Sequence, residues 1–417
     1  SATISGMNER PFSLPSDLRD QPRKRVLIFS PATGASNRGH IAGILRYSMT
    51  IAYWDVLVLA DVPSARTVKQ MTSFAPHGVI MSERFYAELA KRKSLPTCPT
   101  VLFTENVHQS YGDIPCIRTD DEAIGRAAAS HFIAKGCSAF AAVGLHPGLS
   151  ASADERVRAY SNALTQAGKS APFFYGENVP SSGETWTINR SALAAFLSKL
   201  PKPCAIFTIS DAFAWQVLQV CTNHGLVVPG QVRILGCDND EMFCRAAEPR
   251  LSSVAPDYNA GGYLAGKVLS RLIWGRESSV LGRCFPYGIK GIAERESTLD
   301  PTGLNYTIVR AKEFIAEHYA EDLSVADVAA ALKISKRLLN LHFSKTSAKS
   351  VHEEILKTRL RNLAALLIRR DTPIREATIQ CGFKSENHAK FVFKKRFGMT
   401  MRDYRDKPRR RSEVILP

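Results

Sequence analysis

The chain has 417 residues, of which 45% are hydrophobic and 23% charged, a composition typical of two or three globular domains. No apolar stretch approaches the roughly 20 residues of a membrane helix, and the polar N-terminus lacks a secretory signal, so we expect a cytoplasmic protein without a membrane partner. Nine cysteines without a C-x-x-C pair argue against a metal site, and the net charge of +16 favours an anionic partner.

Residues 1–24 are polar and rich in proline, and we expect a flexible extension there. Between residues 25 and 297, short apolar runs alternate with amphipathic helical stretches, which predicts βαβ units and parallel sheets. A region this long exceeds one doubly wound layer, so we expect two α/β lobes with a cleft between them. The expected strands are 26–30, 55–60, 78–81, 100–104, 139–144, 204–210 and 232–237, and the main helices are 39–53, 121–135, 154–167, 191–200 and 212–224.

Polar side chains follow several of these strands, at the carboxyl ends where parallel sheets bind ligands. Carboxylates accept hydrogen bonds from neighbouring hydroxyls, guanidinium groups donate to them, and an aromatic ring covers the apolar face of a pyranose, so such a cleft suits a sugar. Each aspartate alone is equally well explained as a helix N-cap, but their joint placement favours a binding site. The candidate sugar-binding residues are Arg38, Asp120, Arg156, Trp186, Asp211 and Asp238.

Breakers at Pro301 and Gly303 predict a linker over residues 298–304, followed by an all-α domain over 305–406. From Asp300 onward the chain has 24 lysine and arginine against 14 aspartate and glutamate residues, which gives this part +10 of the total of +16. An excess of positive charge is what neutralisation of phosphates requires. The closing segment 407–417 is a basic tail, which we expect to be a solvated end.

Two helix-turn-helix units follow one another in the C-terminal domain. In the first, apolar residues recur at helical spacing after Ser324, which forms a capping box with Asp327. The second repeats the pattern, with Gly382 at a turn that suits a positive φ. A long helix, 352–369, would hold the two second helices at a fixed separation. Two such units in tandem predict double-stranded DNA as a partner.

In each unit the second helix would enter the major groove of DNA. Arginine and lysine read guanine, asparagine reads adenine and glutamate reads cytosine, whereas phosphate contacts position the protein without specifying a sequence, and we expect about half of the candidates to make those. Leu341 and Phe391 occupy the same place in the two helices and either touch thymine methyls or extend the core. The candidate DNA-binding residues are Lys336, Arg337, Asn340, Glu386, Asn387, His388 and Lys390.

The C-terminal domain resembles the AraC/XylS-type DNA-binding domain. The resemblance is carried by Leu323-Ser324 with Asp327-Val328-Ala329, Cys381-Gly382-Phe383 with Ser385, Phe393-Lys394-Lys395 and Tyr404-Arg405. The region 25–297 resembles the periplasmic-binding-protein-like effector domain of LacI/GalR regulators. That resemblance is carried by Glu155-Arg156-x-x-Ala159-Tyr160, Ile209-Ser210-Asp211, Ile234-Leu235-Gly236-Cys237-Asp238-Asn239, Leu251-Ser252-Ser253-Val254 and Glu294-Arg295-Glu296-Ser297-Thr298.

The order of the two domains, with a doubled DNA unit after the effector domain, resembles the XylR type of xylose-operon regulator. The resemblance implies a sequence-specific regulator that activates sugar-utilisation genes and binds a pentose such as D-xylose in its cleft. It also implies that the protein is a homodimer and that RNA polymerase is a partner. It implies no cofactor and no enzyme activity, and the chain lacks the G-x-S-x-G, P-loop and G-x-G-x-x-G motifs. The alternatives are a different effector, a scaffold domain with a pocket that binds nothing, a transport-type sugar-binding protein and an enzyme.

Overall fold

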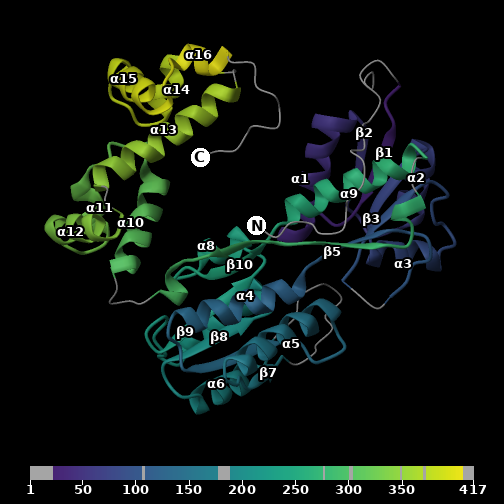
Figure 1. Ribbon diagram of the computed structural model, residues 1–417, viewed down its shortest axis with the longest axis horizontal. Coiled ribbons are helices and arrows are strands. Elements are labelled where there is room, and N and C mark those ends of the chain that lie inside the picture. Colours follow the sequence, from purple (N-terminus) through teal and green to yellow (C-terminus); the bar gives the residue numbers. More distant parts are fainter. Residues whose placement is uncertain are drawn as a thin grey trace. The chain divides into compact units, whose positions relative to one another are not determined.

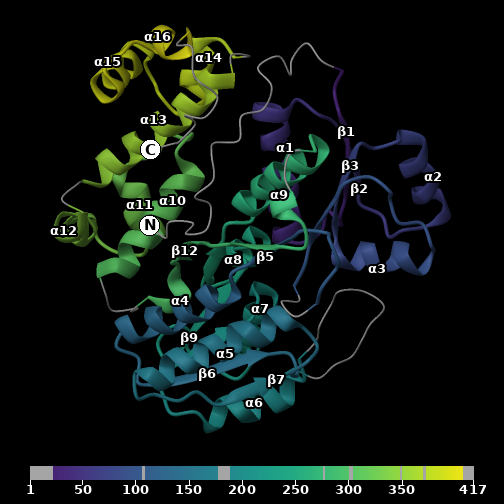
Figure 2. The same ribbon diagram turned by 45° about the vertical axis from the view of Figure 1, so that its right-hand side comes forward.

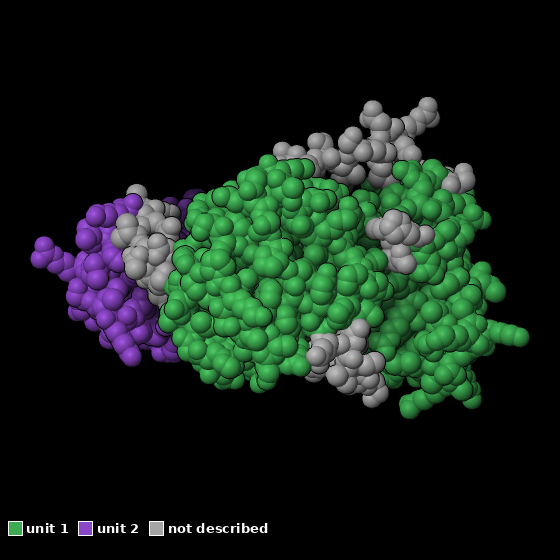
Figure 3. Space-filling view, turned by 90° about the horizontal axis from the view of Figure 1, so that it is seen from below, with its two compact units in different colours: residues 1–293 green, residues 294–417 purple. Residues whose placement is uncertain are grey.

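The computed structural model describes residues 22–105, 109–176, 188–275, 278–299, 304–347, 350–369 and 372–406. The chain forms two compact units, Ser1–Ala293 and Glu294–Pro417, which Figure 3 shows in green and purple. The division therefore lies ahead of the linker expected at 298–304. The expected N-terminal extension and the basic tail lie almost entirely outside the described residues. No described helix combines the length and the apolar character that crossing a membrane requires.

The first unit contains two lobes, each built on a six-stranded sheet. The sheet of the first lobe has the order β11-β5-β4-β3-β1-β2, and all of its neighbouring strands are parallel. Helices α1 and α9 cover one face of this sheet and α2 and α3 the other (Figures 1 and 2). The elements are β1 (Arg25–Phe29), α1 (Ala35–Tyr47), β2 (Asp55–Leu59), α2 (Ala65–Phe74), β3 (Gly78–Ser82), α3 (Glu83–Lys91), β4 (Thr100–Phe103), β5 (Cys116–Thr119), α9 (Tyr258–Ile273) and β11 (Cys284–Tyr287).

The second lobe repeats this plan with the strand order β12-β10-β9-β8-β6-β7, and only β12 runs antiparallel to its neighbour among the described strands. Helices α4 and α5 cover one face, while α6, α7 and α8 cover the other. The elements are α4 (Asp121–Ala134), β6 (Ala139–Gly144), α5 (Ala151–Gln166), β7 (Phe173–Tyr175), α6 (Arg190–Lys199), β8 (Cys204–Thr208), α7 (Asp211–Asn223), β9 (Val232–Cys237), α8 (Glu241–Ala246), β10 (Ser252–Pro256) and β12 (Ile289–Ala293). The prediction of a two-lobed, mainly parallel α/β domain is confirmed.

The chain crosses between the lobes three times, after β5, after β10 and between β11 and β12. The crossings are hydrogen-bonded to one another: Asp120 N–H donates to the Tyr287 carbonyl at 2.9 Å, and Asp257 N–H donates to the Gly288 carbonyl at 3.0 Å. Asp120 and Asp257 also cap the helices that follow, α4 and α9. Three connections side by side form a hinge, which permits rotation of the lobes while it keeps them in register.

Glycines bring two pairs of helices into close contact next to this hinge. A Cβ at Gly262 of α9 would lie 2.0 Å from the His40 carbonyl of α1, and a Cβ at Gly125 of α4 would lie 2.2 Å from the Arg156 carbonyl of α5. Backbones this close leave no room for a side chain. Both contacts position residues of the cavity described below, because His40 and Arg156 are among its lining residues.

The second unit contains helices and no strand among its described residues, and it includes both expected helix-turn-helix motifs. Helices α10 to α12 and the first half of α13 enclose one apolar core, and the second half of α13 packs with α14 to α16 around another. Helix α13 thus links the two helix-turn-helix motifs to each other, as the sequence predicts. The helices are α10 (Leu304–His318), α11 (Val325–Ala331), α12 (Lys336–Ser347), α13 (Val351–Arg369), α14 (Ile374–Gln380), α15 (Glu386–Phe397) and α16 (Met401–Asp406).

Candidate ligand cavity and nucleic-acid interface

A cavity of about 570 Å³ lies between the two lobes of the first unit, on the carboxyl side of the strands. This volume is in the range of small-molecule sites. Both lobes contribute to its wall, and so do Thr119, Tyr258 and Tyr287 at the hinge. Because the wall is shared, a bound molecule would touch both lobes and the segments that connect them.

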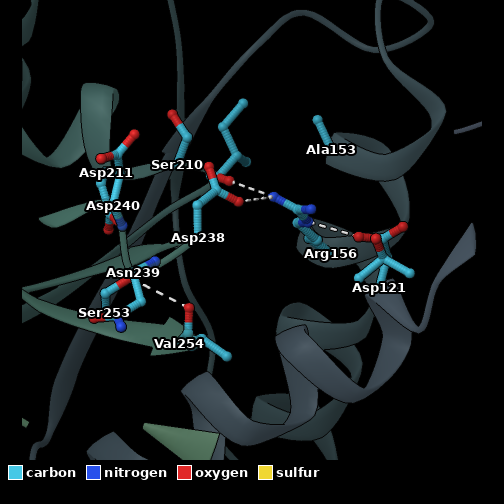
Figure 4. A network of polar contacts seen from close by, with 12 residues as sticks. Asp121, Ala153, Arg156, Ser210, Asp211, Asp238, Asn239, Asp240, Ser253 and Val254 are labelled. Carbon is cyan, nitrogen blue, oxygen red and sulfur yellow. Dashed lines mark hydrogen bonds and ion pairs between the residues drawn. The ribbon is translucent and has the colours of Figure 1, made fainter. Parts of the chain in front are cut away.

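Arg156 of α5 is the centre of the polar network at the cavity (Figure 4). Its side chain is only 11% exposed, and its Nε donates to Asp121 Oδ1 at 2.7 Å. Its Nη1 donates to the Ile209 carbonyl at 2.7 Å and lies 3.5 Å from Asp238 Oδ1. The guanidinium is therefore fixed between two carboxylates, and its contact with Asp238 is the longer of the two ion pairs.

Asp238 sits on a strained turn at the end of β9. Its φ is 103°, and that of Asn239 is 51°, values that residues other than glycine rarely adopt. Hydrogen bonds hold the turn: Asn239 N–H donates to Ser253 Oγ at 2.9 Å, and Asp240 N–H donates to Asp211 Oδ2 at 2.7 Å. Strain that the surroundings maintain in this way is typical of binding sites.

Asp211 supports this turn from behind. Its carboxylate is 1% exposed and is not among the residues that line the cavity. Burial and the neighbouring Asp238 raise the pKa of Asp211 well above its usual range. Gly236 makes room for it, since a Cβ there would lie 2.1 Å from Asp211 Oδ1. Asp211 thus positions Asp238, and the structure places it behind the cavity wall.

Four rings also line the cavity: His40, Phe103, Tyr258 and Tyr287. The His40 and Phe103 rings stack with centroids 4.0 Å apart, and His40 Nε2 shares a 2.7 Å hydrogen bond with the Tyr287 hydroxyl. Burial lowers the pKa of His40 to about 3, so this imidazole is neutral at physiological pH. The Tyr258 hydroxyl donates to Asp238 Oδ1 at 2.6 Å. Ring faces beside hydroxyl and carboxylate groups suit a molecule with one apolar and one polar side, as a sugar ring has.

Polar contacts join the two lobes around the cavity. Arg118 of β5 and Glu155 of α5 form an ion pair at 3.0 Å. Arg38 of α1 reaches Asp240 at the start of α8, at 3.2 Å, and Ser150 Oγ donates to Glu105 at 3.2 Å. These contacts connect the lobes only while the cleft is closed to this degree, so rotation about the hinge would break them.

The six candidates for sugar binding therefore divide. Arg156 and Asp238 line the cavity and lie side by side. Arg38, Asp120 and Asp211 are not lining residues: Arg38 bridges the lobes, Asp120 caps α4 and Asp211 supports the turn. Trp186 lies outside the described residues. Glu83 and Glu105, which directly follow or closely follow β3 and β4, line the cavity, although the sequence analysis did not single them out.

In the C-terminal domain, helices of both helix-turn-helix motifs begin at the serines that the sequence predicts as caps. Ser324 accepts from Asp327 N–H, and Asp327 Oδ2 accepts from Ser324 N–H at 2.8 Å, which completes the capping box. Ser385 caps α15 through its side chain, whose Oγ accepts from His388 N–H. Gly382 has a φ of 77°, and a Cβ there would lie 2.4 Å from the Tyr319 carbonyl, so the second turn requires glycine.

The candidate DNA-binding residues lie at the starts of α12 and α15. Glu386 is partly exposed and forms an ion pair with Lys390 at 2.7 Å. The other six candidates, all exposed, are Lys336, Arg337, Asn340, Asn387, His388 and Lys390. Two helix starts that carry exposed cations and amides have the chemistry that base edges and phosphates require.

Comparison with known proteins gives the same two domains. A model described as a periplasmic binding protein-like domain matches residues 129–298, and one described as a helix-turn-helix domain matches residues 309–407. The xylose operon regulatory protein of Escherichia coli K12 is 28% identical over 94% of this chain and 99% of its own length. That of Haemophilus influenzae is 26% identical over 93% of this chain and 99% of its own length.

A solved structure, that of a xylose-binding transcription activator of the XylR type, resembles nearly the whole chain. Its TM-score is 0.57 and its sequence identity 26%, over 92% of this chain and 98% of that chain. Proteins of this kind thus match nearly the whole length of the chain, across both of its domains.

Proposed function

We propose that this chain, which joins a periplasmic-binding-protein-like domain to a helix-turn-helix domain as the similar xylose operon regulatory proteins do, is a sugar-responsive, sequence-specific regulator of transcription. A regulator of this kind works in the cytoplasm, where the DNA is, and carries out no catalysis. The observation that carries the proposal is one chain that contains both an Arg156–Asp238 pair in a cavity and two exposed recognition helices.

The effector we propose is a pentose, D-xylose first. Neighbouring hydroxyls of a sugar ring donate to a carboxylate and accept from a guanidinium, and Asp238 and Arg156 present these two groups side by side. The rings of Phe103 and Tyr258 supply apolar surface in the same cavity. The relatives of nearly equal length are named for xylose, which sets the order in which sugars are tested.

The switch we propose is closure of the cleft. A sugar that touches both lobes binds the closed form better than the open one, and so shifts the lobes toward closure. The Arg118–Glu155 and Arg38–Asp240 pairs, which join the lobes, favour the same form. If closure changes how the DNA-binding units are presented, operator affinity changes by the same factor as sugar affinity. We propose that sugar strengthens operator binding, that the protein acts as a homodimer, and that it activates RNA polymerase.

Calorimetric titration tests the sugar site. We expect D-xylose, among D-xylose, L-arabinose, D-ribose and D-glucose, to bind, and Asp238→Ala to abolish binding. Asp120→Asn is the matched control, because asparagine also caps a helix and Asp120 does not line the cavity. Binding that survives Asp238→Ala would remove the sugar from this cavity. No binding by any of the four sugars, with operator binding intact, would point to another effector or to a scaffold domain.

A further inference from the structure

Two apolar side chains occupy the same place on the two recognition helices and are both exposed. Leu341 of α12 and Phe391 of α15 each follow the capping serine of their helix by six residues. Their exposed fractions are 45% and 68%. The cores below them are complete without them, since Leu339 and Phe343 in the first unit and Phe393 in the second are fully buried. The option that these residues extend the core is therefore excluded.

Cations surround both apolar side chains. Residues three and four positions away on a helix share its face. Around Phe391 these include Lys394 and Lys395, and around Leu341 they include Arg337 and Lys345, all exposed. Within the described part of the chain, none of these four cations forms an ion pair. An apolar side chain among unpaired cations fits a polyanion that also offers an apolar group.

DNA offers one such group in the major groove. The C5-methyl of thymine is apolar, whereas the other base edges present hydrogen-bond donors and acceptors that leucine and phenylalanine cannot satisfy. We propose that Leu341 and Phe391 each contact a thymine methyl, and so select thymine at one position in each of the two grooves. This inference rests on the proposed function and adds a feature of the operator to it.

The equivalence of the two positions has a geometric consequence. Recognition helices that enter successive major grooves of one DNA face are separated by one helical turn, about 34 Å or 10–10.5 base pairs. Two side chains at the same place on such helices contact bases separated by the same distance. For each bound protomer, the operator therefore contains two selected thymines about one helical turn apart.

Deoxyuridine tests the inference because it differs from thymidine only by the missing methyl. The operator is first selected with the full-length protein from random duplexes, in the presence of the sugar that binds. Each thymine is then replaced singly by deoxyuridine, and the affinity is measured at fixed salt. We expect two replacements per bound protomer, about one turn apart, to weaken binding about fourfold each, the effect of one methyl group removed from an apolar contact.

The side chains are then removed one at a time. We expect Phe391→Ala to bind the thymidine and deoxyuridine forms of one position equally, and Leu341→Ala to do the same at the other position. Ile379→Ala is the matched control, because Ile379 is 61% exposed but lies on α14, the first helix of its unit. This variant should keep both methyl effects.

Three outcomes would overturn the inference and leave the proposed function standing. One is an operator that the protein binds without any effect of deoxyuridine. Another is a methyl effect that persists in both alanine variants. The third is normal operator affinity and methyl effects but lost activation in the variants, which would assign the two side chains to a protein partner. No sequence-specific binding to any selected duplex would overturn the proposed function and the inference with it.

Discussion

The cavity and the recognition helices hold their charged side chains in opposite ways. At the cavity, Arg156 and Asp121 are 11% and 2% exposed and are paired. On α12 and α15, Lys336, Arg337 and Lys394 project into solvent. Charges taken out of water interact strongly and only in one geometry, whereas exposed charges act over distance and are screened by salt. The first arrangement suits recognition of a small neutral molecule, and the second suits a long polyanion.

The largest effect is expected from breaking the buried network. Arg156→Ala leaves the carboxylates of Asp121 and Asp238 without their cation, which we expect to destabilise the first unit by about 3–5 kcal/mol and to abolish sugar binding. Arg158→Ala is the control, because Arg158 pairs with Glu155 at the surface and is 63% exposed. Chemical denaturation and calorimetry measure both effects. A loss of stability no larger for Arg156→Ala than for Arg158→Ala would show that the network is not buried in solution.

Salt sharpens the comparison further. Between 50 and 200 mM salt we expect operator affinity to fall by roughly 10³-fold if about six phosphates are neutralised. Sugar affinity should change less than about twofold over the same range, because the Arg156 network is shielded from ions. Calorimetry for the sugar and equilibrium titration for the operator give the two slopes. A steep salt dependence of sugar binding would contradict the contrast between the two sites.

Two glycine substitutions should separate the two activities. Gly125→Ala would push a Cβ to 2.2 Å from the Arg156 carbonyl, and Gly382→Ala to 2.4 Å from the Tyr319 carbonyl. Overpacking of this kind typically costs about 1–3 kcal/mol. We expect Gly125→Ala to weaken sugar binding alone and Gly382→Ala to weaken operator binding alone. The affinities for sugar and for operator DNA are measured in separate titrations. Equal losses of both activities in either variant would show that the damage is global.

The smallest effect concerns the buried carboxyl behind the turn. The pKa of Asp211 is raised in the folded protein, so its stabilising contribution is complete at low pH and is lost as the pH rises through the folded pKa. Asparagine keeps an oxygen for Asp240 N–H and carries no charge. We expect Asp211→Asn to gain in Tm over the wild type, by about 2–4 °C more at pH 8 than at pH 5, the shift that about 1 kcal/mol produces. A lower Tm at pH 8 would show that the charge itself is needed.

Much of the fold was predictable because its signals are local. Seven strands of the sheets contain continuous apolar runs, and the capping serines of the DNA-binding units stand directly before their helices. The strands β5, β7, β10, β11 and β12 were not among the expected strands. They are three to five residues long, and two of them end in or contain proline, so their pairing depends on neighbours far away in the sequence.

The site was predictable only in part. The rule that ligands meet polar residues after strands selects Arg156 and Asp238, which line the cavity, and equally Asp120 and Asp211, which do not. All four follow or approach a strand end, but the rule does not tell which way a side chain points. Tyr287 was not among the predicted site residues because it lies on β11, a strand that the sequence did not predict. That the candidates contact sugar or DNA stays a prediction.

The central claim is that a sugar in the cavity of the first unit sets the affinity of the second unit for DNA. Operator affinity, measured at one salt concentration with and without saturating D-xylose, tests it most directly in the wild type and in Asp238→Ala. We predict at least about a fivefold gain in operator affinity with sugar, the lower end of typical coupling between sites, and no gain in the variant. Equal wild-type affinity with and without a sugar that demonstrably binds would contradict the account.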